Sequence, residues 1–304
     1  MSLRAELVRL GLRWFVKRKI GPQTTVEAWR RRVAVLGRLV PHPPKDTQVR
    51  RVDLDGVKGV SVASGQSSGD RLILYLHGGG HAAGSPALYR DFTWRLSAAA
   101  RARVIVIDYR LAPEHPFPAA LDDAVKAYRG LLAAGVDPRR TALAGESSGG
   151  GLVFAMLLKL RDERSRLPAA AVALSPWTDL AMTGPSLQCN AELDPMIRSE
   201  AAARLATYYL AGSDPRTPYA SPLYGDPTGL PPTLIQVGSD EVLLDDSVRM
   251  AERMRAAGCQ VELEIWPRMP HAWQLWARLV PEARLAIERV GAFVQSKIAP
   301  QAAR

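Results

Sequence analysis

The chain of 304 residues predicts an α/β fold with a mostly parallel central sheet, helices on both faces of the sheet, and a small helical cap. Three observations support this prediction. Short apolar runs alternate with longer helix-like stretches, as βαβ units require. The runs are continuous in their apolar character, which indicates strands that are buried on both faces. A helix-like insertion at residues 179–215 interrupts the alternation, and two helix-like stretches precede it at residues 1–40.

The first 63 residues do not yet follow the alternating pattern. Residues 1–40 predict two helices that are separated at Gly21-Pro22, because glycine and proline together interrupt helical periodicity. A proline-rich link follows at residues 41–44, and then a hairpin of residues 49–54 and 58–63 around Asp55-Gly56. We expect residues 1–45 to form the N-terminal part of the cap, with residues 179–215 as its second part, and residues 46–304 to form the main domain.

The rest of the chain supplies the sheet and the helices that cover it. The expected strands are residues 72–76, 104–107, 141–144, 170–174, 234–237 and 261–265. The expected helices are residues 89–100, 119–134, 152–161, 242–257 and 281–296.

The net charge of +10 comes from the beginning of the chain. Residues 1–51 hold 13 Lys and Arg against 3 Asp and Glu, so that the remaining residues have 27 of each sign and are balanced. A basic segment of this kind suits an anionic membrane or nucleic acid. We favour a different interpretation, in which the apolar side of an amphipathic helix, with Leu7, Leu10, Trp14 and Phe15, packs on the main domain. No nucleic-acid motif accompanies the charge.

The sequence contains no apolar run that is long enough for a transmembrane helix, and its basic first twenty residues lack the apolar core of a secretory signal. Cys189 and Cys259 have no metal-like spacing. We expect two free thiols, as in a cytoplasmic protein.

Gly145-Glu146-Ser147-Ser148-Gly149 lies between a strand-like run and a helix-like run. In this setting Gly-x-Ser-x-Gly predicts a sharp turn that presents a nucleophilic serine, here Ser147, above the edge of a sheet. Residues 65–69 match the same pattern, but they lie in a polar Ser/Gly cluster and no apolar helix follows them. That second copy predicts only a flexible turn.

Two further strand ends predict the partners of the serine. His77-Gly78-Gly79-Gly80 follows the run 72–76 and predicts an oxyanion hole, to which Ser148 adds its own N–H. His271 follows the last strand and precedes the final helix, which makes it the candidate general base. The acid is expected after the run 234–237, where Asp240 and Glu241 are adjacent. Either carboxylate could orient an imidazole, and the residues alone do not decide between them.

These motifs resemble the hormone-sensitive-lipase-like esterases of the α/β-hydrolase superfamily, also called bacterial lipase family IV. The resemblance covers about residues 50–300. It rests on residues 77–80, Tyr109-Arg110-Leu111-Ala112-Pro113-Glu114, residues 145–150, Trp177-Thr178-Asp179 and His271. In that family the acid begins an Asp-x-Leu-x-Asp segment, and Leu243 and Asp245 fit its later positions. The resemblance therefore favours Glu241 over Asp240, although the family carries aspartate there.

The resemblance implies a serine carboxylesterase that hydrolyses short- to medium-chain acyl esters through an acyl-enzyme, without metal or organic cofactor. Residues 46–304 would then be the catalytic domain. Supporting roles fall to His77, Gly78 and Glu146, which stands where the family often has aspartate. His81 either lines the mouth of the substrate site or is a solvated loop residue. Arg110 and Glu114 are expected to pair and to support the oxyanion loop.

Several alternatives stay open at this level. The same triad would serve a lactonase, deacetylase or amidase, and some relatives of the fold are ligand receptors without catalysis. The expected partner is a small-molecule ester, with no nucleic acid and no integral membrane segment, and the resemblance allows a homodimer.

Overall fold

The computed structural model describes residues 1–298 apart from residues 20 and 22. Its centre is an eight-stranded sheet with the order β1-β2-β4-β3-β5-β6-β7-β8. The strands are β1 (Gln48–Leu54), β2 (Val57–Ala63), β3 (Ser68–Leu76), β4 (Ala102–Ile107), β5 (Thr141–Glu146), β6 (Ala170–Leu174), β7 (Thr233–Gly238) and β8 (Val261–Trp266). The hairpin of β1 and β2 joins β4 in antiparallel fashion, whereas all pairs from β4 to β8 are parallel. The predicted fold class is confirmed.

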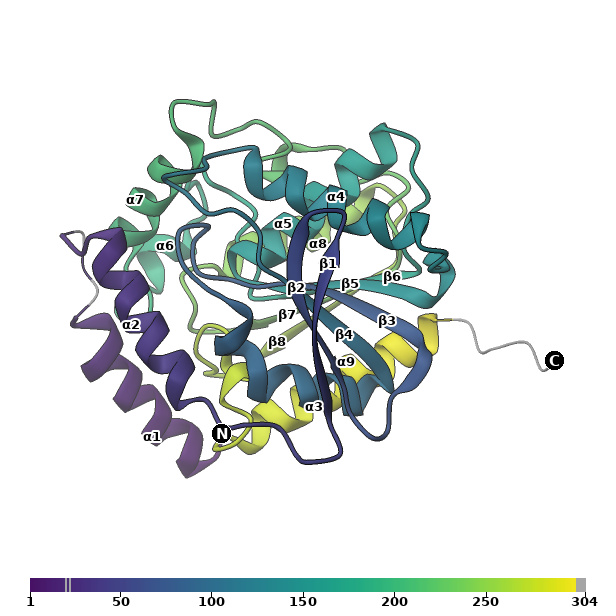
Figure 1. The fold of residues 1–304 in the computed structure, drawn as a ribbon. Helices are drawn as coiled ribbons and strands as arrows, with labels where there is room; N and C mark the ends of the chain where they lie inside the picture. The colour runs from purple at the N-terminus through teal and green to yellow at the C-terminus, as the bar shows by residue number, and fades with distance from the viewer. Residues whose placement is uncertain (20, 22, 299–304) are drawn as a thin grey trace.

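Helices cover both faces of this sheet, as predicted (Figure 1). The α-helices are α1 (Leu3–Leu12), α2 (Val26–Leu39), α3 (Arg90–Ala100), α4 (Ala119–Ala133), α5 (Ser148–Asp162), α6 (Ser186–Cys189), α7 (Ser199–Leu210), α8 (Leu244–Ala256) and α9 (Pro281–Lys297). A π-helical turn, η1 (Arg13–Lys17), extends α1, and short 3-10 turns lie at residues 86–89, 138–140, 222–224 and 273–276. We predicted a break between the first two helices at Gly21-Pro22, and of these two residues Pro22 lies outside the described residues.

The continuous apolar runs are explained by two cores, one on each face of the sheet. Alternate side chains of a strand point to opposite faces. On β3, Leu72, Leu74 and Leu76 enter the core formed with α4, α5 and α8. Ile73 and Tyr75 of the same strand enter the other core, with α3 and α9. A strand between two such cores must be apolar at every position, which is the pattern that the sequence shows.

The N-terminal helices lie against the flank of the molecule beside α6 and α7 (Figure 1). Lys17 Nζ donates a hydrogen bond of 2.7 Å to the carbonyl of Asp194, and Arg198 Nε donates one of 2.8 Å to the carbonyl of Lys17. Arg13 also bonds the carbonyl of Glu192. Burial lowers the pKa of Lys17, although the charge of Asp194 opposes this effect. The segment 1–19 and the insertion 179–215 are therefore joined by charged groups.

Our expectation about the apolar side of the first helix is wrong. Leu7, Leu10, Trp14 and Phe15 are exposed, with 48–71% of their surface open to solvent. The buried positions are instead Ala5, Arg9, Leu12 and Lys17. Arg9 and Lys17 face inward because their charged groups find partners on that side. Arg9 binds the carbonyl of Arg268 and the carboxylate of Asp240, and Lys17 donates to the carbonyl of Asp194. The helix thus turns its apolar stripe away from the protein.

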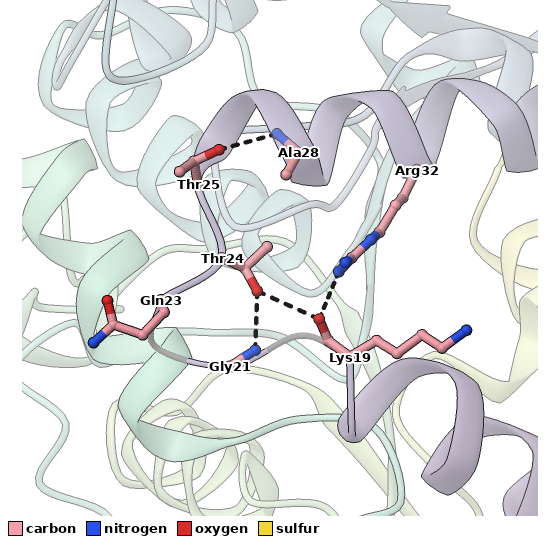
Figure 2. Close-up of a pocket in the computed structure, with 7 residues that line it drawn as sticks. All are labelled: Lys19, Gly21, Gln23, Thr24, Thr25, Ala28 and Arg32. Atoms are coloured by element: carbon pink, nitrogen blue, oxygen red, sulfur yellow. Dashed lines mark hydrogen bonds between the residues drawn. The ribbon is translucent and has the colours of Figure 1, made fainter.

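A shallow hollow lies where η1 leads into α2 (Figure 2). Thr24 Oγ1 accepts from Gly21 N at 3.1 Å, and Arg32 donates to the carbonyl of Lys19 at 2.6 Å. Thr25 begins α2 by accepting a hydrogen bond from Ala28 N at 3.2 Å. None of the residues around this hollow is a predicted site residue, so we place no chemistry there.

Candidate active site

Ser147 occupies the turn between β5 and α5, as predicted. Its backbone has φ of 57° and ψ of −125°, a conformation that is costly for a residue with a side chain. Its N–H bonds the carbonyl of Leu174 at 2.9 Å, which ties the turn to the end of β6. A Cβ on Gly149 would collide with the carbonyl of Leu76, so only glycine allows this close approach. The turn holds Ser147 at the carboxyl ends of the parallel strands.

The second Gly-x-Ser-x-Gly copy, residues 65–69, covers the turn after β2 and the first two residues of β3. Its Ser67 donates a hydrogen bond of 2.8 Å to the carbonyl of Ser64, and Ser68 donates one of 2.8 Å to the carbonyl of Arg101. These serines satisfy local backbone groups. The prediction of a turn without a following helix is confirmed.

His271 and Glu241 meet although 30 residues separate them in the chain. His271 Nδ1 lies 2.8 Å from Glu241 Oε2, and neither side chain is more than 3% exposed. The other carboxylate oxygen, Oε1, accepts from Gly238 N at 2.6 Å and from Ser175 Oγ at 2.7 Å. Both oxygens of Glu241 are thus engaged, and the imidazole keeps Nε2 for another partner.

The buried pair alters the titration of the histidine. Burial by itself lowers the pKa of His271, but the hydrogen bond and the negative charge of Glu241 outweigh it, with further help from Asp194 and Glu146. The pKa of His271 is therefore raised. A carboxylate that stabilises the imidazolium in this way is what a general base needs during proton transfer.

Asp240, the rival acid, points elsewhere. Its Oδ2 lies 2.8 Å from Arg9 Nη2, and its Oδ1 accepts a hydrogen bond of 2.9 Å from Ser239 Oγ. Arg9 also donates to the carbonyl of Arg268 at 2.7 Å, in the loop that leads to His271. Asp240 therefore anchors helix α1 to the two loops behind the histidine, whereas Glu241 contacts the histidine itself.

The register of the sheet explains why these groups converge. Glu146 on β5 is opposite Leu174 on β6, and Gly238 on β7 is opposite Trp266 on β8. The loops that follow these strands therefore leave the sheet at the same edge. A Cβ on Gly238 would collide with the carbonyl of Met269, so that the acid and base loops lie in direct contact.

The predicted oxyanion loop has the geometry that its glycines permit. Gly79 and Gly80 have φ of +116° and +62°, which side chains rarely adopt. The N–H groups of Gly79, Gly80 and Ser148 donate no hydrogen bond within the described part of the chain. His81 N donates to Ser148 Oγ at 3.2 Å and so fastens the loop to the serine turn. The three N–H groups are available to a ligand.

Glu146 lies beneath this loop and braces it through Tyr89. Its carboxylate accepts from Tyr89 Oη at 3.1 and 3.2 Å, and Tyr89 Oη in turn accepts from Gly78 N at 3.0 Å. Burial raises the pKa of Glu146 to about 7, although the charge of His271 and the bond from Tyr89 act in the opposite direction. A Cβ on Gly78 would collide with this buried carboxylate, so a larger residue there would have to displace Glu146.

The two histidines of the loop are structural. His77 stacks on Tyr109 with ring centres 4.4 Å apart, and burial lowers its pKa to about 4. His81 stacks on Tyr209 of α7 at 3.7 Å, and burial lowers its pKa to about 3. His81 is only 3% exposed, so the expectation of a solvated loop residue is wrong. Both rings are neutral at physiological pH.

The expected pair of Arg110 and Glu114 does not form. Arg110 binds Asp123 at 2.8 Å, because the start of α4 lies beside it. Glu114 faces α2 instead, where Arg30 meets it at 2.6 Å. Arg30 also donates to the carbonyl of Ala82 at 2.8 Å. The oxyanion loop is thus braced from α2, by a residue that lies 84 positions from its partner in the chain.

Sequence reasoning missed several polar residues around the acid. Asp194 is fully buried and accepts from Val242 N at 3.0 Å, and Asn190 Nδ2 donates to the carbonyl of Glu241 at 2.8 Å. Both come from the insertion, and no local pattern marked them. Ser175 does follow a strand, so the rule of reading strand ends could have found it.

The Trp177-Thr178-Asp179 motif holds the start of α8, which follows the loop of Asp240 and Glu241. Asp246 accepts from Thr178 N at 2.7 Å and from Asp179 N at 2.9 Å. Burial raises the pKa of Asp246 to about 8, and the nearby Asp179 adds to this effect. Asp179 binds Arg249 at 3.0 Å, and its pKa is lowered because its hydrogen bonds, with Thr183 foremost, outweigh its burial. The motif therefore joins the end of β6 to the start of α8.

The fold and this site define a class of protein: a serine hydrolase built on the α/β-hydrolase fold. Comparison with known proteins agrees. The profile of the alpha/beta hydrolase fold family matches residues 73–275. An acetyl-hydrolase of Streptomyces hygroscopicus is 50% identical over 226 residues, which are 74% of this chain and 76% of that protein.

Solved structures are similar over nearly the whole chain. An esterase from the bacterial hormone-sensitive lipase family superposes with a TM-score of 0.93 at 43% identity, and the match covers 98% of this chain and 99% of the other. EstE5, soaked with p-nitrophenyl butyrate, matches with a TM-score of 0.93 at 38% identity over 99% of this chain and 100% of the other.

The chain belongs to the hormone-sensitive-lipase-like esterases of the α/β-hydrolase superfamily. It is a carboxylic ester hydrolase, a serine carboxylesterase. Among the helices of the described residues, none has the length and apolar character to cross a membrane.

Proposed function

We propose that Ser147 is the nucleophile, His271 the general base and Glu241 the acid of a catalytic triad, and that Gly79, Gly80 and Ser148 form the oxyanion hole. The observation that carries this proposal is the buried pair of Glu241 and His271, with Nδ1 and Oε2 2.8 Å apart. Because Nδ1–H faces the carboxylate, the neutral ring presents the lone pair of Nε2 to the serine turn. The hydrogen bond between Nε2 and the Ser147 hydroxyl is itself a prediction.

The reaction follows from these positions. His271 Nε2 takes the proton of Ser147 as Oγ bonds to the ester carbonyl carbon, and the three free N–H groups stabilise the oxyanion. The intermediate collapses, its C–O bond breaks, and the leaving alkoxide takes the proton from His271. Water then attacks the acyl-enzyme while His271 accepts its proton. That proton returns to Ser147 Oγ as the carboxylic acid leaves.

We infer that the substrates are small esters with short- to medium-chain acyl groups. Leu205 of α7 lies directly over the oxyanion loop, since a Cβ on Gly80 would come within 2.5 Å of Leu205 Cδ1. The stacked rings of His81 and Tyr209 close the same side. The printed names of the relatives, an acetyl-hydrolase and an esterase soaked with a butyrate ester, agree with small acyl groups.

We also propose that residues 1–45 and 179–215 act together as the cap and that residues 46–304 form the catalytic domain. The bonds of Lys17, Arg13 and Arg198 between the two cap parts support this division. Unpaired Cys189 and Cys259 support a cytoplasmic location. A homodimer, either through an edge strand such as β8, where Ile265 is 47% exposed, or through the terminal helix, stays a prediction that analytical ultracentrifugation checks.

An ester panel tests the assignment. Wild-type protein and Ser147→Ala are compared on p-nitrophenyl acetate, butyrate, octanoate and palmitate. We expect the wild type to prefer the shorter esters and Ser147→Ala to be inactive, and a preference for palmitate would contradict the proposed acyl range. Labelling of folded wild type by a fluorophosphonate separates an esterase from a receptor. Lactones and amides on the same panel test the lactonase, deacetylase and amidase alternatives.

A further inference from the structure

The first helix of the protein exposes a continuous apolar stripe, formed by Leu3, Leu7, Leu10, Trp14 and Phe15. The first four recur at intervals of four, three and four residues, the spacing of one helical face. Their exposed fractions are 77%, 60%, 48% and 54%, and that of Phe15 is 71%. A helix that packs on a globular core turns such a face inward, but this one buries Arg9 and Lys17 instead.

Exposed large apolar side chains are concentrated in the N-terminal segment and are not scattered evenly over the protein surface. Of the fourteen large apolar side chains exposed in the described part of the chain, nine belong to residues 1–39. Besides the stripe they include Val35, Leu36 and Leu39 on α2. Gathered exposed apolar groups of this kind mark a surface that another body covers.

Basic side chains accompany the stripe. Arg4 is exposed on α1, Arg18 and Lys19 are exposed in the turn that follows η1, and Arg31, Arg32 and Arg38 are exposed on α2. The guanidinium of Arg18 lies 3.6 Å from the ring centre of Trp14, and the Lys19 ammonium lies 5.6 Å from that of Phe15. In Figure 2 the Lys19 side chain extends away from Gly21 and Thr24. Aromatic rings beside cations suit the boundary between lipid headgroups and acyl chains.

We propose that the stripe docks on the surface of a membrane that contains anionic lipid. The positive charge of the N-terminal segment, together with its apolar stripe, favours an anionic bilayer over a second copy of the chain or nucleic acid. Residues 1–51 hold 13 Lys and Arg against 3 Asp and Glu, and within the first 19 the sole acid, Glu6, neighbours Arg9 and Arg268. A second copy would bring the same positive charge to the contact. Nucleic acid would satisfy the cations but leave the apolar stripe in water, whereas an anionic bilayer satisfies both.

The opposite side of the same helix reaches the loops of the active site. Arg9 binds Asp240, beside Glu241, and Lys17 binds the carbonyl of Asp194. A bilayer under the stripe would therefore lie against the outer side of the cap. Docking would bring the esterase to esters dissolved in or released from the lipid, without insertion of the chain into the bilayer.

Vesicle sedimentation tests the proposal. Full-length protein is mixed with vesicles of phosphatidylcholine alone or of phosphatidylcholine with phosphatidylglycerol, at low and high NaCl. We expect binding to the anionic vesicles that weakens with salt. The double variant Trp14→Ala, Phe15→Ala should bind at least about tenfold more weakly, because its apolar contribution is lost. Arg4→Glu, Arg18→Glu should weaken binding to a similar extent.

A matched control removes exposed leucines elsewhere. Leu279 and Leu285 are 48% and 50% exposed, and Leu279→Ala, Leu285→Ala should bind as the wild type does. Hydrolysis of p-nitrophenyl acetate and the melting temperature show that each variant is folded. The proposal is overturned if wild type ignores anionic vesicles or if the aromatic variant binds equally well. A dimer that only the aromatic variant disrupts, or salt-dependent binding to DNA without binding to vesicles, would likewise overturn it.

Discussion

Replacing Glu241 by glutamine should nearly abolish esterase activity because it reverses the tautomer of His271. Oε1 of Glu241 accepts from Gly238 N at 2.6 Å and from Ser175 Oγ at 2.7 Å. An amide NH₂ is a hydrogen-bond donor and cannot accept from the N–H of Gly238. The glutamine oxygen must therefore take the position of Oε1, where it accepts that bond. Its NH₂ then faces Nδ1 of His271, which has to accept the hydrogen bond and carry its proton on Nε2.

An imidazole with its proton on Nε2 cannot take a proton from Ser147. Loss of the correct tautomer in a serine triad lowers kcat by about 10⁴-fold, which corresponds to about 5.5 kcal/mol of transition-state stabilisation. Asp240→Asn should leave kcat within about threefold, because Asp240 binds Arg9 and not His271. The two variants differ by one position in the chain and remove the same charge, so each controls for the other.

The assay measures kcat and KM on p-nitrophenyl butyrate for both variants, with circular dichroism to confirm folding. Fluorophosphonate labelling of Ser147 should slow in Glu241→Gln to the same extent as kcat. The reasoning is refuted if Asp240→Asn loses activity as severely as Glu241→Gln, or if folded Glu241→Gln retains more than about a tenth of the wild-type kcat.

Three further predictions concern stability and specificity. The pKa of Glu146 is raised to about 7, so the folded state binds more protons than the unfolded state between about pH 4.5 and 7, and stability should fall as pH rises through this window. Glu146→Gln should remove about 2–3 kcal/mol of that fall, measured by urea unfolding at pH 5 and pH 8. Arg9→Met leaves Asp240 without its cation and should lower the free energy of unfolding by about 2–4 kcal/mol, again by urea. Leu205→Ala opens the space above Gly80 and should raise kcat/KM for octanoate relative to acetate by about tenfold.

Each of these has a contrary outcome. An unchanged pH dependence in Glu146→Gln would show that this carboxyl does not titrate in the window. Arg9→Met is paired with Arg4→Met, whose exposed side chain should cost almost nothing, and equal losses would remove the argument from the Arg9 contacts. An unaltered acyl preference in Leu205→Ala would place the acyl chain elsewhere.

The apolar runs were sufficient to predict the sheet and its covering helices, because a strand between two cores is apolar at every position. The serine turn could be predicted as well, because Ser147 and its glycines are neighbours in the chain and lie between a strand-like run and a helix-like run. His271 and the glycines of residues 78–80 could be proposed because each lies in the loop that follows a strand. In a parallel sheet these strand ends share one edge, so order along the chain already implies nearness in space.

The pairings between distant segments could not be predicted. Arg110 and Glu114 are four residues apart and opposite in charge, yet Asp123 and Arg30 lie nearer to them in the folded chain. The sequence also could not predict which side of the first helix faces the protein. Its periodicity shows an apolar stripe but not which way the stripe faces, and the inward polar groups that hold Arg9 and Lys17 come from residues 191–268.

The amino-acid sequence by itself determined the fold class, the serine turn, the loop of free N–H groups and the candidate base, because each depends on neighbouring residues or on a strand end. The residues alone left two adjacent carboxylates open and the family resemblance favoured Glu241, but the tertiary structure is what shows that Glu241 meets His271. Asp240 and Glu241 share one loop but point to different partners, Arg9 from the first helix and His271 from the last loop. That choice depends on how this loop meets the first helix on one side and the loop of His271 on the other, which no local pattern records.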